Sequence, residues 1–204
     1  LLNAQTDAQA IVQINAITEV NGEEQIGWHS TGALISPDGL ILTSARAVLG
    51  SRFYPVNDLI VALTVTPDMP PVEKYRASIV QVDEMLDVAV LKLRTDLSGT
   101  PLDYSSLQLP ALSVASTVSA YLPGEPLFVW GFPTSDGEPL RRLDGLVVGV
   151  LSEAQAGDQA RILTSFDAEG DYFGWIATNS IGELVGIARP PSMSANLTCQ
   201  ALLD

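Results

Sequence analysis

The sequence predicts an all-β protein made of two similar lobes of antiparallel strands. Short runs of β-branched and aliphatic residues recur along the chain, separated by Gly, Pro, Asp and Asn. The 3.6-residue periodicity of long helices is almost absent. Evenly spaced short strands are typical of an antiparallel sandwich or barrel, and 204 residues suffice for two lobes of roughly 100 residues each.

The amino-acid composition limits the kinds of protein and partner that fit this sequence. Hydrophobic residues make up 47% of the chain and charged residues 17%, which predicts a packed globular protein. The net charge of −14 argues against nucleic acid and anionic membranes as partners, and favours either a solvated acidic surface or a basic partner. No apolar run approaches the roughly 20 residues that span a bilayer. Since the sequence starts at Leu1, we expect a processed or excised piece of a longer chain.

The first half contains six predicted strands. Alternating apolar and polar residues over 10–20 predict a half-buried strand, followed by a turn at Asn21-Gly22-Glu23-Glu24. Residues 30–48 follow as a strand, a tight turn at Pro37-Asp38-Gly39 and a second strand. A short helix is compatible with the residues after Arg46. The other strands are predicted at 59–66, 77–82 and 88–93.

The second half repeats this pattern after a connection. Residues 95–119 are rich in Ser, Leu, Pro and Thr and show no clear period, so we interpret them as the link between the lobes. The strands predicted beyond it are 127–131, 145–151, 161–165, 174–178 and 184–188.

Five segments carry motifs of one known family, in the family's order: 30–48, 87–93, 122–133, 144–151 and 182–187. Together they resemble trypsin-like serine proteases of the bacterial HtrA/Deg type. The resemblance implies a trypsin-like double barrel, two six-stranded antiparallel β-barrels packed together, over residues 1 to about 112 and about 113 to 204. It also implies a bacterial protein in the periplasm, outside the cell or at the cell envelope.

The resemblance fails at the positions of the family's catalytic residues. Arg46 stands where the family has the histidine base, whereas Asp87 matches the carboxylate that orients this base. Counting back from Gly182 places Phe173 at the nucleophilic serine, or Tyr172 if one residue is inserted. The glycine that helps form the oxyanion hole becomes Asp171 or Gly170. Loss of the serine or histidine alone costs about 10⁶ in kcat in subtilisin, so we expect no triad proteolysis.

Two further expectations follow from these positions. A guanidinium stays protonated and bonds a carboxylate through two N–H groups, so Arg46 and Asp87 are predicted to form an ion pair in place of the histidine–aspartate pair. Tyr172, Phe173 and Trp175 bring three aromatic side chains to the former nucleophile loop. They either fill the core or the cleft, or form an apolar surface for a partner.

No other constellation in the sequence replaces the triad. His29 is the only histidine, Cys199 is the only cysteine, and neither has metal-ligand spacing around it. Ser44, Ser165 and Ser180 lie outside any Gly-x-Ser-x-Gly motif. The acidic run 167–171 is interpreted as a solvated loop rather than a cation site.

The sequence therefore predicts a pseudoprotease without cofactor or metal. We expect it to bind a protein or peptide, with strand addition beside the old cleft as one mode, and to act within a larger protein or complex. Two alternatives stay open at this point. One is a hydrolase with a noncanonical or displaced active site, and the other is a purely structural domain whose partners lie elsewhere.

Overall fold

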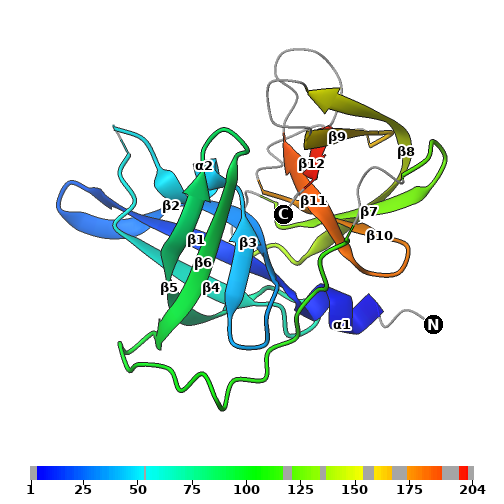
Figure 1. Ribbon diagram of the computed structural model, residues 1–204. Coiled ribbons are helices and arrows are strands. Elements are labelled where there is room, and N and C mark those ends of the chain that lie inside the picture. The colour runs from blue at the N-terminus through cyan, green and yellow to red at the C-terminus, as the bar shows by residue number, and fades with distance from the viewer. Residues whose placement is uncertain are drawn as a thin grey trace.

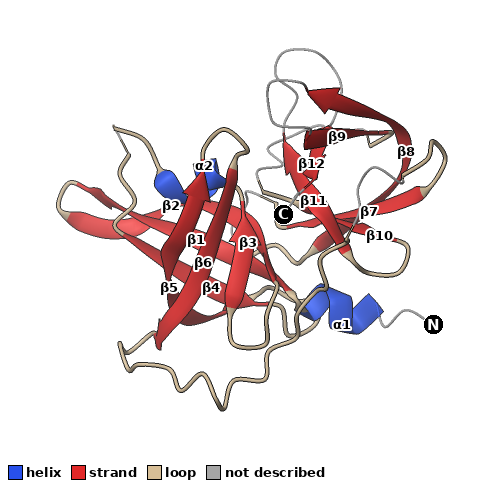
Figure 2. Cartoon of the chain, in the orientation of Figure 1, coloured by secondary structure: helices blue, strands red, loops and turns tan. Residues whose placement is uncertain are grey.

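The protein is a double β-barrel (Figures 1 and 2). The computed structural model describes residues 4–52, 54–116, 121–133, 137–153, 159–166, 174–189 and 198–201. Within these residues, two sets of six antiparallel strands each close into a barrel, which confirms the predicted fold class.

The first barrel contains the N-terminal strands, hydrogen-bonded in the order β1-β2-β3-β6-β5-β4 with β4 returning to β1. Two short helices accompany it, and they lie at opposite ends of the barrel in Figure 1. The elements are α1 (Ala4–Gln9), β1 (Ile11–Val20), β2 (Glu23–Leu34), β3 (Leu40–Thr43), α2 (Ala45–Leu49), β4 (Asp58–Leu63), β5 (Val72–Asp83) and β6 (Val88–Asp96).

Two predicted turns fix the register of the first barrel. Asn21 and Gly22 both have positive φ, 56° and 85°, as a two-residue type I′ hairpin turn between β1 and β2 requires. Gly39 has φ 89°, and its N–H donates to the Ser36 carbonyl over 3.1 Å. The alternation in β1 places Val12 and Ile14 in the barrel, but Gln13 and Asn15 are also buried, at 5% and 2% exposed, so the prediction of a half-buried strand is wrong.

The second barrel is ordered β10-β11-β12-β9-β8-β7, with β7 pairing back to β10. Its strand β12 was not located from sequence, and β8 is longer than the predicted 145–151. The elements are β7 (Pro126–Gly131), β8 (Arg141–Glu153), β9 (Gln159–Thr164), β10 (Ile176–Asn179), β11 (Leu184–Arg189) and β12 (Thr198–Ala201).

The connection between the barrels is bound to both of them. The N–H of Leu112 donates to the Leu34 carbonyl in the first barrel over 2.9 Å. The carbonyl of the next residue, Ser113, accepts from the Leu184 N–H in the second barrel over 2.8 Å. The boundary that we predict near residue 112 lies within this connection.

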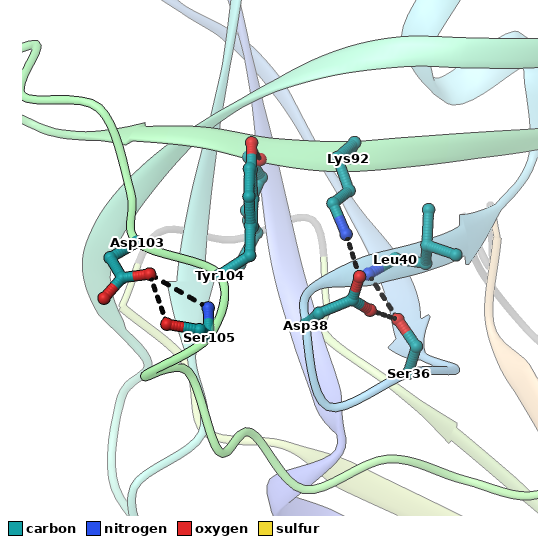
Figure 3. A network of polar contacts seen from close by, with 8 residues as sticks. Ser36, Asp38, Leu40, Lys92, Asp103, Tyr104 and Ser105 are labelled. Atoms are coloured by element: carbon teal, nitrogen blue, oxygen red, sulfur yellow. Dashed lines mark hydrogen bonds and ion pairs between the residues drawn. The ribbon is translucent and has the colours of Figure 1, made fainter.

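A polar network fixes the start of the connection to the first barrel (Figure 3). Nζ of Lys92 lies 2.6 Å from Oδ2 of Asp38 and 4.6 Å from the centre of the Tyr104 ring. The Tyr104 hydroxyl donates to the Leu93 carbonyl over 2.8 Å. The connection therefore follows β6 instead of leaving the barrel surface.

The two barrels meet through buried side chains and a buried hydrogen bond. The N–H of Phe132, just after β7, donates to Oγ1 of Thr31 in β2 over 2.9 Å. Trp130 and Phe132 are 7% and 2% exposed and belong to the same hydrophobic core as the interior of the first barrel. This shared core holds the residues that follow β3 close to the residues that precede β10.

Candidate functional site

The candidate site lies at the end of the first barrel where α2 meets the turn between β5 and β6. This turn ends at Asp87, which has φ 57° and is 3% exposed. Asp tolerates the left-handed region better than most residues because its short side chain can bond locally. The conformation directs the Asp87 carboxylate at the first turn of α2.

The Asp87 carboxylate is held by donors from the start of α2. The Ser44 hydroxyl donates to Oδ1 over 2.9 Å, and the backbone N–H of Arg46 donates to the same oxygen over 3.0 Å. The Asp87 carbonyl also accepts from the N–H of Ala45 over 3.2 Å. Since Ser44 makes no side-chain capping bond of its own, Asp87 satisfies the free N–H groups of this helix end.

The ion pair that we predict between Arg46 and Asp87 is present, with one correction to its geometry. Nε of Arg46 lies 3.6 Å from Oδ2 of Asp87, and the Arg46 side chain is 57% exposed. A charge-assisted N–H···O bond measures about 2.7–2.9 Å, so the expected two-bond contact is not formed. The reason is that the backbone N–H of Arg46 and the Ser44 hydroxyl already bind Oδ1.

Trp175 lies buried where the former nucleophile loop rejoins the barrel. It is 2% exposed, and its indole N–H donates to the Phe132 carbonyl over 3.1 Å. A Cβ added to Gly131 would lie 2.0 Å from the Trp175 ring, so only glycine fits beneath it. Of the two readings, core filling describes Trp175, because a buried indole offers no surface to a partner.

The remaining residues predicted for this loop are outside the described residues. They are Gly170, Asp171, Tyr172 and Phe173, together with the acidic run 167–171. Gly174, which follows them, has φ 72°, and a Cβ there would lie 2.9 Å from the Thr31 carbonyl. The chain therefore enters β10 in close contact with β2.

The lone histidine lies in a polar chain that links three strands of the first barrel. Nδ1 of His29 is 2.8 Å from Oδ1 of Asn15, and Nδ2 of Asn15 donates to Oε1 of Glu73 over 2.7 Å. These contacts join β2 to β1 and β1 to β5, so the imidazole is engaged by the wall of the barrel.

The serines considered from sequence do not assemble a nucleophile at Asp87. Ser44 is 1% exposed and donates directly to the carboxylate, and Oγ of Ser165 accepts from the Leu146 N–H over 2.9 Å. Ser180 is exposed in the turn between β10 and β11. The described part of the chain holds no group of three or more His, Cys, Asp or Glu suited to a metal ion. No helix in that part is long and apolar enough to cross a membrane.

A comparison with protein families agrees with this fold. The model of the trypsin-like peptidase domain matches residues 30–187, which is more than half of the chain. The matched range includes both barrels from β2 to β11 and the positions of Arg46 and Asp87. No curated protein matches the chain in sequence.

Proposed function

The chain belongs to the trypsin-like peptidase domain family, and we propose that it is a catalytically inactive member of the HtrA/Deg type that binds a protein or peptide partner. The observation that carries this proposal is Arg46, which the motif order aligns with the general base and whose Nε lies 3.6 Å from Oδ2 of Asp87. The HtrA/Deg assignment is supported by the Ser36-Pro37-Asp38-Gly39 turn and the strands on either side of it.

Arg46 supplies no route for proton transfer. A serine hydroxyl becomes a nucleophile when an imidazole removes its proton and a carboxylate orients that imidazole. A guanidinium remains charged at any pH the fold survives, so it accepts no proton. Asp87 does not replace the base, because one of its oxygens binds two donors and the other faces Nε of Arg46.

The nucleophile is the second loss in this proposal. Strand β10 begins at Ile176, and counting back from Gly182 aligns Phe173, or Tyr172, with the serine. Phe173 carries no nucleophilic atom, and a phenol with a pKa of about 10 needs a base beside it. Two independent losses support an inactive protein more strongly than a single odd substitution does.

A binding role is supported by the intact fold of the chain. Both barrels close, the interface between them is buried, and Asp87 still secures the start of α2. A rigid scaffold of this kind positions exposed loops and strand edges for a partner without any chemistry. We propose that this is the use to which the fold is put, within a larger protein or complex.

Activity measurements test the catalytic half of the proposal. Incubation with a fluorophosphonate probe and with unfolded casein should give no labelling and no cleavage. The variant Arg46→His should remain inactive, because the serine is also absent. Labelling of the wild-type protein, or cleavage of casein by it, would overturn the proposal and favour a hydrolase with a noncanonical or displaced active site.

The binding half needs a separate measurement. Pull-down from the native source should recover a protein partner with the wild-type chain, and a parallel sample should carry Tyr172→Ala and Phe173→Ala. Loss of the partner in that sample would place the binding surface at the former nucleophile loop. Absence of any partner from both samples would favour a structural domain instead.

A further inference from the structure

The hairpin of β1 and β2 extends from the first barrel on the side away from the second barrel (Figure 1). Its two strands pair from Ile11 with Ala33 to Val20 with Glu23. On its other edge, β2 pairs with β3 only through Gly32, Ala33 and Leu34. Among the described residues, no strand pairs with that edge between Glu23 and Gly27, and all five of these residues are exposed, so this stretch of strand edge is open to another strand.

A small hollow borders this part of β2 on one face of the hairpin. Its volume is about 220 Å³, below the range of about 300–1,000 Å³ typical of small-molecule sites, and so suits a single side chain. Three isoleucines, three charged residues and one glutamine line it: Ile17, Ile26, Ile60, Glu24, Glu73, Arg76 and Gln25. Arg76 is already paired with Asp58, which leaves the two glutamates to set the charge of the hollow.

A second hollow borders the same part of β2 on the opposite face. Its volume is about 280 Å³, and it is lined by uncharged residues, among them Val20, Trp28 and Tyr54. Val20 and Tyr54 are 38% and 64% exposed, so apolar surface is available there. The two faces of the hairpin thus differ in chemistry, one apolar and acidic, the other apolar and neutral.

The hairpin also carries an unbalanced negative charge. Glu19 lies directly opposite Glu24, and Glu23 begins β2 beside them, opposite Val20. Like charges directly opposite each other destabilise an antiparallel pair. No Lys or Arg precedes Arg46 in the sequence, so neither strand of the hairpin supplies a Lys or Arg to balance these carboxylates.

From these observations we propose that the free edge of β2 binds an extended basic peptide segment by strand addition. Side chains of an added strand alternate between the two faces of the sheet. A Lys or Arg of the segment places its aliphatic stem on the three isoleucines and its charge near Glu24 and Glu73. The neighbouring residue, which is apolar, enters the hollow beside Val20, Trp28 and Tyr54.

This inference rests on the binding role proposed above, but it does not involve Arg46, Asp87 or the former nucleophile loop. The partner is a protein with an extended, exposed segment in which basic and apolar residues alternate. The strongly acidic surface then serves to attract that segment, and its attraction should weaken with salt.

A capped hexapeptide of alternating valine and lysine tests the proposal. Titrated into the full chain, it should shift the amide NMR signals of Glu23–His29, and raising the salt from 0.05 M to 0.5 M should weaken binding. The same peptide with N-methyl groups on alternate amides should lose most of its affinity, because it cannot pair with the strand edge. A peptide with glutamate in place of lysine should not bind.

Matched variants locate the site. Glu24→Gln combined with Glu73→Gln should weaken binding by about fivefold or more, since two exposed charge contacts are lost. The Glu73→Gln change retains a side-chain oxygen that accepts from Asn15, so the fold is preserved, which circular dichroism would verify. Asp68→Asn removes one exposed negative charge elsewhere in the barrel and should leave the affinity unchanged.

The outcomes separate this inference from the proposed function. If the valine–lysine peptide does not bind, or binds equally well when N-methylated or to the double variant, strand addition at β2 is wrong. A partner recovered by pull-down and lost with Tyr172→Ala and Phe173→Ala would then still support the proposed function. Protease activity would overturn the inactive assignment without changing the peptide titration.

Discussion

The two ends of the β3–β6 pair each carry an aspartate–cation contact, and the two contacts are built in opposite ways. At one end, Asp87 is 3% exposed and its cation, Arg46, is 57% exposed. At the other end, Asp38 is 50% exposed and its cation, Lys92, is only 20% exposed. The comparison shows that the same two charges act differently depending on which partner is buried.

At the Asp87 end, backbone and hydroxyl donors satisfy the carboxylate, and the cation adds little. At the Asp38 end, the cation is the group that organises its surroundings, because Lys92 contacts both Asp38 and the Tyr104 ring (Figure 3). Asp87, which the motif order aligns with the family's aspartate, therefore caps a helix, whereas the Asp38–Lys92 pair holds the connection between the barrels.

The largest expected effect comes from removing the buried carboxylate. Asp87→Ala should lower the free energy of unfolding by about 3 kcal/mol, because the Ser44 hydroxyl and the Arg46 N–H lose their acceptor. Asp87→Asn keeps an acceptor oxygen and should cost much less. Urea denaturation of both variants measures the difference. Equal losses of unfolding free energy would mean that Asp87 does not act mainly as a hydrogen-bond acceptor.

Removal of the Lys92 ammonium group should have a smaller effect on the free energy of unfolding. Lys92→Met keeps the aliphatic stem but loses both the contact with Asp38 and the contact with the Tyr104 ring. The loss of unfolding free energy should be less than a third of that for Asp87→Ala, since exposed ion pairs contribute little. Lys74→Met, on the exposed side of β5, is the matched control. Hydrogen exchange at the Leu102 amide should also become faster, because the connection is released.

Removal of the exposed cation at the other end should have almost no effect on stability. Arg46→Ala should lower the free energy of unfolding by about 0.5 kcal/mol or less, because the side chain is solvated and makes one long contact. Arg94→Ala serves as a control for loss of an exposed arginine. A loss as large as that of Asp87→Ala would mean that the pair, rather than the helix cap, stabilises this end of the barrel.

The smallest effect is a pH dependence at the Asp38 end. Hydrogen bonds from Lys92 and from the Ser36 hydroxyl lower the pKa of Asp38 below its usual 3.8. A lowered pKa stabilises the fold above the unfolded pKa, and this contribution is lost as the pH falls through the folded pKa. Stability of the wild type relative to Asp38→Asn should therefore decline below about pH 4. A difference that stays constant from pH 6 to pH 3 would contradict this assignment.

Local patterns were enough to predict most of the fold. The alternation in β1, the Asn21-Gly22 turn and the turn before β3 are each encoded within a few residues. Strand β12 was missed because the sequence around Thr198–Ala201 shows neither a clear alternation nor a turn signal. The helix predicted after Arg46 starts at Ala45 and so includes the arginine itself.

The candidate site was predicted in part, for a similar reason. Motif order identified Arg46 and Asp87 and their pairing. It did not reveal that Asp87 caps α2, because the bonded groups are more than 40 residues apart and depend on the positive φ of Asp87. The fit of Trp175 over Gly131 likewise joins two distant segments and needs the closed barrels to become visible.

The placement of the strands along the chain has a consequence for synthesis on the ribosome. The last of the six strands of the first barrel ends at Asp96, before any strand of the second barrel begins. Because the N-terminal part of a chain generally folds first during translation, we expect the first barrel to close while the second is still being made. The Thr31 hydroxyl and the Leu34 carbonyl are then already in place when Leu112 and Phe132 are synthesised. The N–H groups of these two later residues bond to acceptors that are already folded.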